Sequence, residues 1–142
     1  MSNYFIDKYE ENRLVAYKCP SGVWTIGKGI TVYPDGSPVK EGDEISKEAS
    51  EALLNDYLIR NVDPVIRKMS MKFTRRQKEA LESLIFNIGA TAFKKSKLYK
   101  AILENNSELI FKNWDWIRGN GKVLKGLVKR RAEELSWFLS DS

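Results

Sequence analysis

The stretch from Glu10 to Gly29 constrains the fold of this chain most, because its character changes twice within a short distance. Its first residues are typical of the end of a polar helix, and a Pro-Ser-Gly turn follows at 20–22. Val23–Ile26 then has the composition of a short strand, closed by glycines. A carboxylate, a thiol and a hydroxyl are thereby delivered to one region by a helix end, a turn and a strand. This arrangement is typical of an enzyme that assembles its site at a cleft.

A short helix is expected before this stretch. Ser2 or Asn3 is suited to cap its N-terminus, and the helix should run to about Glu11. Glu10 then falls near the C-terminus, where the helix dipole disfavours negative charge, as suits a general acid. The alternative is an ordinary surface glutamate, since Glu is rarely buried. The expected apolar side of the helix consists of Tyr4, Phe5 and Tyr9.

Residues 16–45 predict a small β region. Its strand candidates are Val23–Ile26 and Ile30–Tyr33, which are rich in β-branched and aromatic residues. Residues 34–38, Pro-Asp-Gly-Ser-Pro, predict a tight turn, and residues 40–43 predict a second one.

From Ser46 onwards, apolar residues recur at helical spacing. Ser46 is suited to cap a long helix, in which Pro64 predicts a kink or break near residues 61–64. Thr74 and Gln77 form a capping-box pattern for a central helix that ends at Gly89. Three further helices are expected. Ser96 is suited to cap the first, and Ser107 is suited to cap the second, whose apolar residues are Leu109, Ile110, Trp114 and Ile117. The third covers Leu127–Leu139, with Leu127, Leu135, Phe138 and Leu139 facing inward and Lys129, Arg130 and Arg131 facing outward.

These elements predict an α+β fold. We expect a single domain, 1–142, with a small β lobe at about 12–45 and a larger helical lobe at about 46–142 that includes the N-terminal helix. The long helix after Ser46 would join the lobes, with a cleft between them.

The chain has no histidine, and Cys19 is its only cysteine. An intrachain disulfide, a Cys/His zinc site and the Ser-His-Asp and Cys-His nucleophile systems are therefore excluded. Acid-base chemistry falls to Asp, Glu, Lys, Tyr or the one thiol. We expect no metal and no cofactor.

The formal net charge of +5 favours an anionic partner, but the basic residues are spread along the chain and no nucleic-acid-binding motif is present. We therefore expect no nucleic-acid partner. No apolar run has transmembrane length, and the N-terminus lacks the pattern of a signal peptide. The expectation is a cytoplasmic protein without stable membrane insertion.

Glycosidic bond cleavage needs a proton donor for the leaving oxygen and a group on the other face of the sugar that handles water or positive charge. Glu10 is the candidate donor, and it is followed by Cys19 and Thr25 in the pattern Glu-x8-Cys-x5-Thr.

This pattern resembles the catalytic signature of the phage-type lysozymes, or endolysins, a family of glycoside hydrolases. It is embedded in Arg-Leu-x-Ala-Tyr at 13–17 and Trp-Thr-Ile-Gly-x-Gly at 24–29. The resemblance continues in Phe-Asn-Ile-Gly at 86–89 with Ala-Phe at 92–93, and again in the Gly, Lys and Arg pattern of residues 121–131. It covers nearly the whole chain in order and implies a lysozyme-like fold.

The resemblance also implies roles. Glu10 would be the general acid, Cys19 would place or activate the attacking water where the family often has Asp, and Thr25 would help hold that water. The substrate would be the β-1,4 linkage between N-acetylmuramic acid and N-acetylglucosamine in bacterial peptidoglycan. A phage or prophage lysis enzyme would wait in the host cytoplasm until a holin opens the membrane, and we expect a monomer. By the same matching, the sugar groove would be lined by Thr31, Phe86, Ser96 and Asn113.

Three positions depart from the family pattern. Glu11 stands where the family usually has Gly, and it either favours the protonated form of Glu10 by like-charge repulsion or faces solvent. Ile30 replaces the usual His, so we expect a structural ion pair to be missing there. Cys19 brings a thiol with an ordinary pKa of about 8.5, mostly neutral at pH 7, which favours water positioning over base catalysis. Arg13 is a candidate partner for Glu10.

Two other functions remain open. A lysozyme fold that has lost catalysis and only binds the wall is one, although such a module has no need of Glu10, Cys19 and Thr25. A lytic transglycosylase, which forms an anhydro product without water, is the other, and the presence of two water-holding residues speaks against it.

Overall fold

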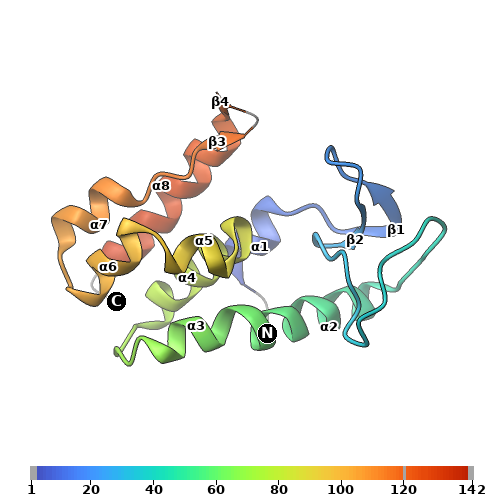
Figure 1. Ribbon diagram of the computed structural model, residues 1–142, viewed down its shortest axis with the longest axis horizontal. Helices are drawn as coiled ribbons and strands as arrows, with labels where there is room; N and C mark the ends of the chain where they lie inside the picture. Colours follow the sequence, from blue (N-terminus) through green and yellow to red (C-terminus); the bar gives the residue numbers. More distant parts are fainter. Residues whose placement is uncertain (1–2, 120, 141–142) are drawn as a thin grey trace. The chain divides into compact units, whose positions relative to one another are not determined.

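The computed structural model describes residues 3–119 and 121–140 and has the predicted α+β composition of many helices with small antiparallel sheets (Figure 1). The chain divides into two compact units, 1–60 and 61–142. The elements of the first unit are α1 (Tyr4–Tyr9), β1 (Arg13–Lys18), β2 (Trp24–Gly27) and α2 (Lys47–Tyr57).

Helix α1 begins at Asn3, whose buried side chain accepts hydrogen bonds from the backbone N–H groups of Phe5 and Ile6 at 3.0 and 3.1 Å. The predicted Asn3 cap is confirmed, and its alternative, Ser2, lies outside the described residues. The predicted apolar side is partly wrong, because Tyr4 is exposed and Ile6 is buried beside Phe5.

Strands β1 and β2 form an antiparallel hairpin in which Tyr17 lies opposite Thr25 (Figure 1, blue). The predicted strand at 23–26 is confirmed within one residue. Strand β1 was not predicted, because the polar residues at 10–13 are typical of the end of a polar helix. A bulge between Arg13 and Tyr17 interrupts the register, and Val15 pairs instead with Glu44 on the other edge of β1.

The remainder of the β region consists of turns. The predicted strand Ile30–Tyr33 is wrong, since only isolated bridges form there, Ile26 with Ile30 and Val32 with Pro38. Both predicted turns are confirmed: the Asp35 side chain accepts from the Ser37 N–H at 2.9 Å, and the Asp43 N–H donates to the Lys40 carbonyl at 3.1 Å. The apolar core of the region is formed by Ile26, Ile30 and Val39, with Ala16, Trp24, Tyr33, Ile45, Leu53 and Tyr57 packed against it.

Helix α2 begins at Ser46, whose hydroxyl accepts from the Ala49 N–H at 3.0 Å, as predicted. The predicted irregularity before Pro64 takes the form of a π-helical segment, η1 (Leu58–Val62), followed by α3 (Asp63–Lys68) with Pro64 in its first turn. The boundary between the two units falls within η1.

The second unit is helical, and its α4 and α8 pack against each other most extensively. Thr74 and Gln77 form the predicted capping box of α4, which ends at Gly89. The elements after α3 are α4 (Arg75–Ile88), α5 (Ala90–Lys94), α6 (Lys97–Leu103), α7 (Ser107–Asn113), β3 (Arg118–Gly119), β4 (Lys122–Val123) and α8 (Lys125–Leu139).

Three details of this unit differ from the predictions. The cap of α7 is Asn106 rather than Ser107, and the helix ends at Asn113. The short pair β3–β4 follows where a longer helix was expected. Leu139, predicted to face inward, is exposed.

The largest correction concerns α8. Arg130 and Arg131, predicted to face outward, are 3% and 2% exposed, and Glu134 is fully buried with them. The Arg131 Nη2 lies 2.9 Å and the Arg130 Nε 3.3 Å from Glu134 Oε2. Trp114 Nε1 donates to the same carboxylate at 3.2 Å, and the Ser83 hydroxyl donates to it as well. These five side chains form the buried charge cluster of the second unit.

Candidate active site

Glu10 lies directly after the last turn of α1. Its backbone is extended, with ψ 131°, and its N–H donates to the Ile6 carbonyl at 3.0 Å, which ends the helix. The side chain is half-buried. Glu11 is 71% exposed and forms an ion pair with Arg13 at 2.8 Å, so it faces solvent. The ion pair of Arg13 at 2.8 Å is therefore with Glu11, the residue after its candidate partner Glu10.

Cys19 opens the turn between β1 and β2. The Cys19 N–H donates to the Val23 carbonyl at 3.0 Å, and the Gly22 N–H donates to the Cys19 carbonyl at 2.8 Å. Gly22 has φ +85°, a conformation that side chains rarely adopt, which allows the chain to reverse here. The Cys19 Sγ lies 2.9 Å from the Ser21 hydroxyl oxygen. The turn thus presents a partly exposed thiol with a hydroxyl beside it.

The environment of Cys19 favours its thiolate. The Ser21 hydroxyl, then the Val23 amide, and to a smaller extent the Thr25 hydroxyl lower the pKa of Cys19 to about 7. A larger share of thiolate than the ordinary pKa gives makes base catalysis chemically available to Cys19.

Thr25 is buried in β2, opposite Tyr17. Its hydroxyl donates to the Val23 carbonyl at 3.0 Å. The same hydroxyl lies close enough to Cys19 to lower the pKa of that thiol, and its oxygen lone pairs can accept from a donor such as water. The structure therefore brings together two of the three predicted catalytic side chains, Cys19 and Thr25, across one turn.

Tyr17 was not predicted as a site residue, yet the charges of Glu10, Glu11 and Cys19 all act on its phenol. Its pKa is raised, first by partial burial; the charge of Arg13 lowers it, and those of Glu11, Glu10 and Cys19 raise it. The Tyr17 phenol therefore lies within electrostatic range of both Glu10 and Cys19. The Arg13 guanidinium covers the Tyr17 ring at 4.5 Å. Because Tyr17 lies on the unpredicted strand β1, sequence reasoning gave it no position.

Lys28 was also missed. It is 5% exposed, and its Nζ donates to Asp7 Oδ1 at 2.6 Å and to Glu51 Oε1 at 2.9 Å. We call these three residues the Lys28 clamp. Lys28 thus forms its ion pairs two residues before Ile30, and Ile30 itself is buried in the apolar core.

The predicted groove residues are divided between the two units. Thr31 is exposed in the first unit, and its carbonyl accepts from the Val39 N–H at 3.0 Å. In the second unit, Phe86 is half-buried on α4. The Ser96 hydroxyl caps α6, accepting from the Tyr99 N–H at 3.0 Å. Asn113 Nδ2 donates to the Leu109 carbonyl at 2.8 Å. Their role in binding sugar stays a prediction.

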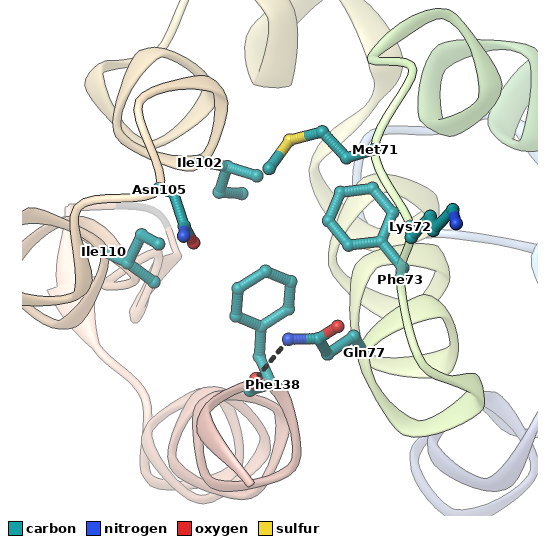
Figure 2. Close-up of a pocket in the computed structure, with 8 residues that line it drawn as sticks. All are labelled: Met71, Lys72, Phe73, Gln77, Ile102, Asn105, Ile110 and Phe138. Carbon is teal, nitrogen blue, oxygen red and sulfur yellow. Dashed lines mark hydrogen bonds between the residues drawn. The ribbon is translucent and has the colours of Figure 1, made fainter. Parts of the chain in front are cut away.

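A pocket of about 190 Å³ lies elsewhere, within the second unit (Figure 2). Its walls are mainly apolar, and Gln77 Nε2 donates to the Phe138 carbonyl at 3.1 Å. None of the predicted site residues lines it. Its lining residues are Met71, Lys72, Phe73, Gln77, Ile102, Asn105, Ile110 and Phe138.

Residues 3–119 and 121–140 hold no candidate metal site and no candidate membrane span. No three acidic or cysteine side chains in these ranges are grouped closely enough to hold a metal ion. No helix there combines the length and the apolar character that a membrane span needs.

Comparison with known proteins places this geometry in a family. Residues 7–134 match the family model described as phage lysozyme. The endolysin of Acyrthosiphon pisum secondary endosymbiont phage 1 is 36% identical over 140 residues, which cover 95% of this chain and 92% of that protein. The endolysin of Bacillus phage B103 is 35% identical, but this chain spans only 51% of its length.

Solved structures agree in fold. The endolysin from Escherichia coli O157:H7 phage FAHEc1 superimposes with a TM-score of 0.83 at 29% identity, over 99% of this chain and 94% of that one. A P22 lysozyme mutant gives a TM-score of 0.79 at 33% identity, over 96% and 93%. The α+β fold is therefore lysozyme-like, as the resemblance implied. The chain belongs to the phage lysozyme family.

Proposed function

We propose that the chain is an endolysin, a glycoside hydrolase that cleaves the β-1,4 linkage between N-acetylmuramic acid and N-acetylglucosamine in bacterial peptidoglycan. The observation that carries this proposal is a phage lysozyme family match that includes Glu10, Cys19 and Thr25, the last two meeting across one turn. The relatives compared above are named endolysins.

Glu10 is the proposed general acid. Departure of the sugar oxygen requires a proton from a group held in place beside it. Glu10 is half-buried at the end of α1, whereas Glu11 is exposed and bound to Arg13, so Glu10 is the carboxyl group suited to this role.

Cys19 and Thr25 are the proposed water-holding pair. The Thr25 oxygen accepts a hydrogen bond from the water, and the Cys19 thiolate accepts a proton from it as the water attacks the anomeric carbon. Ser21 supports this step, because its hydrogen bond to Cys19 stabilises the thiolate. In this assignment Cys19 acts as a base and also positions the water.

The wider proposal follows the family. Residues 1–142 act as one lysozyme-like domain with a β lobe at about 12–45, and Thr31, Phe86, Ser96 and Asn113 line the glycan groove. The protein acts as a monomer and reaches the wall from the host cytoplasm through a holin-opened membrane. Light scattering tests the monomer, and lysis of cells with and without a co-expressed holin tests the route.

The decisive experiment compares wild type, Glu10→Gln and the matched control Glu11→Gln on purified peptidoglycan. We expect wild type and Glu11→Gln to clear the wall and Glu10→Gln to fail. Reaction in heavy-oxygen water, followed by mass analysis, should place the label at the new reducing ends.

The other outcomes assign the other functions. Anhydro products without label would identify a lytic transglycosylase. A folded wild type that clears no wall type but sediments with peptidoglycan would identify a wall-binding module. Full activity of Glu10→Gln together with loss in Glu11→Gln would move the acid role to Glu11.

A further inference from the structure

The Lys28 clamp joins three elements of the first unit. Lys28 lies between β2 and the turns that follow, Asp7 lies on α1, and Glu51 lies on α2. The contacts are short, 2.6 Å to Asp7 and 2.9 Å to Glu51, and they connect residues 21 and 23 positions apart. A single cation therefore ties two helices to the end of the strand that carries Thr25.

Burial makes this cation dependent on its partners. An ammonium group removed from water is costly unless carboxylates and hydrogen bonds replace its hydration. Burial alone lowers the pKa of Lys28, but the hydrogen bonds and charges of Asp7 and Glu51 outweigh burial and raise it. Lys28 is therefore charged at neutral pH and held in one place. Its two carboxylate partners remain partly exposed, at 38% and 44%.

The backbone on both sides of Lys28 is tightly turned and lies close to α2. Gly27 and Gly29 flank Lys28 with φ of +63° and +86°, which favour glycine. A Cβ atom on Gly27 would lie 2.9 Å from the Ser50 hydroxyl, so α2 approaches the backbone closely here. The same hydroxyl donates to Asn12 Oδ1 at 2.6 Å. Two polar connections thus fix α2, β2 and the segment after Glu10 together.

The members of the Lys28 clamp lie close in sequence to the proposed catalytic residues. Asp7 precedes Glu10 by three residues, and Lys28 follows Thr25 by three residues. Helix α1 has only 6 residues, too few to hold a fixed geometry without tertiary contacts. A shift at the Asp7–Lys28 contact would therefore be transmitted to the distance between the Glu10 carboxyl and the water held at Thr25.

We propose that Lys28 is a positioning residue: through Asp7 and Glu51 it holds α1, and with it Glu10, in register with Thr25 and Cys19 on the β1–β2 hairpin. The inference rests on the proposed function, because it takes Glu10 as the acid. In this role Lys28 acts through Asp7 and Glu51 rather than on the substrate.

The test uses Lys28→Met, which keeps the length of the side chain and removes its charge. The matched control is Lys112→Met, which removes an exposed ion pair to Glu108 at 3.2 Å. Rates are measured on soluble peptidoglycan fragments at a temperature where circular dichroism shows every variant folded. Since small misplacements reduce rates by up to about 10²-fold, we expect kcat to fall about tenfold or more in Lys28→Met, with KM within about twofold.

A second variant separates positioning from stability. In Asp7→Asn/Lys28→Met/Glu51→Gln the two carboxylates left without their cation are neutralised, so thermal stability should recover. If Lys28 positions the acid, kcat stays low although the melting temperature returns. Recovery of kcat together with the melting temperature would overturn the proposal, as would wild-type kcat in Lys28→Met. Should Lys28→Met fail to fold, Asp7→Asn replaces it, and a fall in kcat at constant KM is again the expected result.

Glu10→Gln is measured alongside to separate this inference from the proposed function. An active Glu10→Gln would refute the acid assignment regardless of Lys28. An inactive Glu10→Gln with a fully active Lys28→Met would refute the clamp alone.

Discussion

The first unit buries a cation, Lys28, between two carboxylates that keep contact with solvent, whereas the second buries a carboxylate, Glu134, together with two arginines that have lost nearly all such contact. The difference matters when one member is removed. Asp7 and Glu51 can regain water by small side-chain rotations, but the partners of Glu134 have no such path. We infer that the first arrangement mainly sets geometry and the second mainly sets stability.

The packing around the Lys28 clamp and around the buried charge cluster also differs. The apolar core of the β region in the first unit rests on three buried side chains, Ile26, Ile30 and Val39. The second unit packs the long helices α4 and α8 together and encloses the buried charge cluster between them. The proposed catalytic side chains lie in the unit with less regular structure, where contacts such as the Lys28 clamp must supply the rigidity that helix packing supplies elsewhere.

The largest expected effect comes from Glu134→Leu. Removing the carboxylate that both arginines contact should lower the free energy of unfolding by about 3–5 kcal/mol, as for other buried pairs broken from one side. Urea denaturation measures this. Lys28→Met is the matched variant in the first unit, and because the two carboxylates that it leaves behind are partly exposed we expect a loss of only about 1 kcal/mol. Equal losses in the two variants would break the comparison.

Cys19→Ser comes next, because the proposed base is lost. If the thiolate accepts the proton, kcat/KM of the wild type rises with pH through about 7, where Cys19 loses its proton, and Cys19→Ser falls about 10²-fold above that pH. Cys19→Asp should restore the rate and move the rise to about pH 4, the ordinary range of a carboxyl group.

A different result would reassign the thiol. A Cys19→Ser variant within a few-fold of wild type, with no change of slope near pH 7, would mean that Cys19 only positions water. The pH profile of Lys112→Met, far in sequence from the β1–β2 turn, provides the reference curve.

Most helix caps were predicted correctly from the sequence, because a cap depends only on hydrogen bonds between neighbouring residues. The caps Asn3, Ser46, Thr74 and Ser96 each use a side chain that bonds an amide two or three residues ahead. Strand β1 was missed because the polar residues before it indicated a helix end, and because part of its pairing is to residues far along the chain, such as Val15 opposite Glu44. A strand defined partly by distant partners leaves little signal in its own sequence.

The arginines of α8 illustrate a second limit. Lys129, Arg130 and Arg131 were all placed outward, yet three consecutive helical residues spread over more than half a turn, so one face cannot hold them all. Lys129 is exposed and the two arginines are buried. The available signal was Glu134, which stands three and four residues after them, at the spacing of helical ion pairs. For the Lys28 clamp no local spacing was available, because its three members are far apart in sequence.

Removing a helix cap should have a smaller effect on stability, and the two units each offer one cap for comparison. Asn3→Ala removes two buried hydrogen bonds from α1, a helix of 6 residues, and should cost about 1–2 kcal/mol. Thr74→Ala removes one cap bond from α4, a helix of 14 residues, and should cost about 1 kcal/mol. Because α1 ends at Glu10, we expect only Asn3→Ala to lower kcat as well. A larger loss of activity in Thr74→Ala would contradict this assignment of roles.

The smallest effect should be the same in both units. Arg60 pairs with Asp56 at 3.0 Å in the first unit, and Lys112 pairs with Glu108 at 3.2 Å in the second. Both cations are more than half exposed, at 57% and 63%, and both pairs place the acid four residues before the base. Arg60→Met and Lys112→Met should therefore each change the free energy of unfolding by only about 0.3–0.5 kcal/mol, less at high salt. If either variant loses more than about 1 kcal/mol of unfolding free energy, exposed charge contributes to the difference between the units. If both losses stay small while that of Glu134→Leu is large, the difference between the units comes from burial.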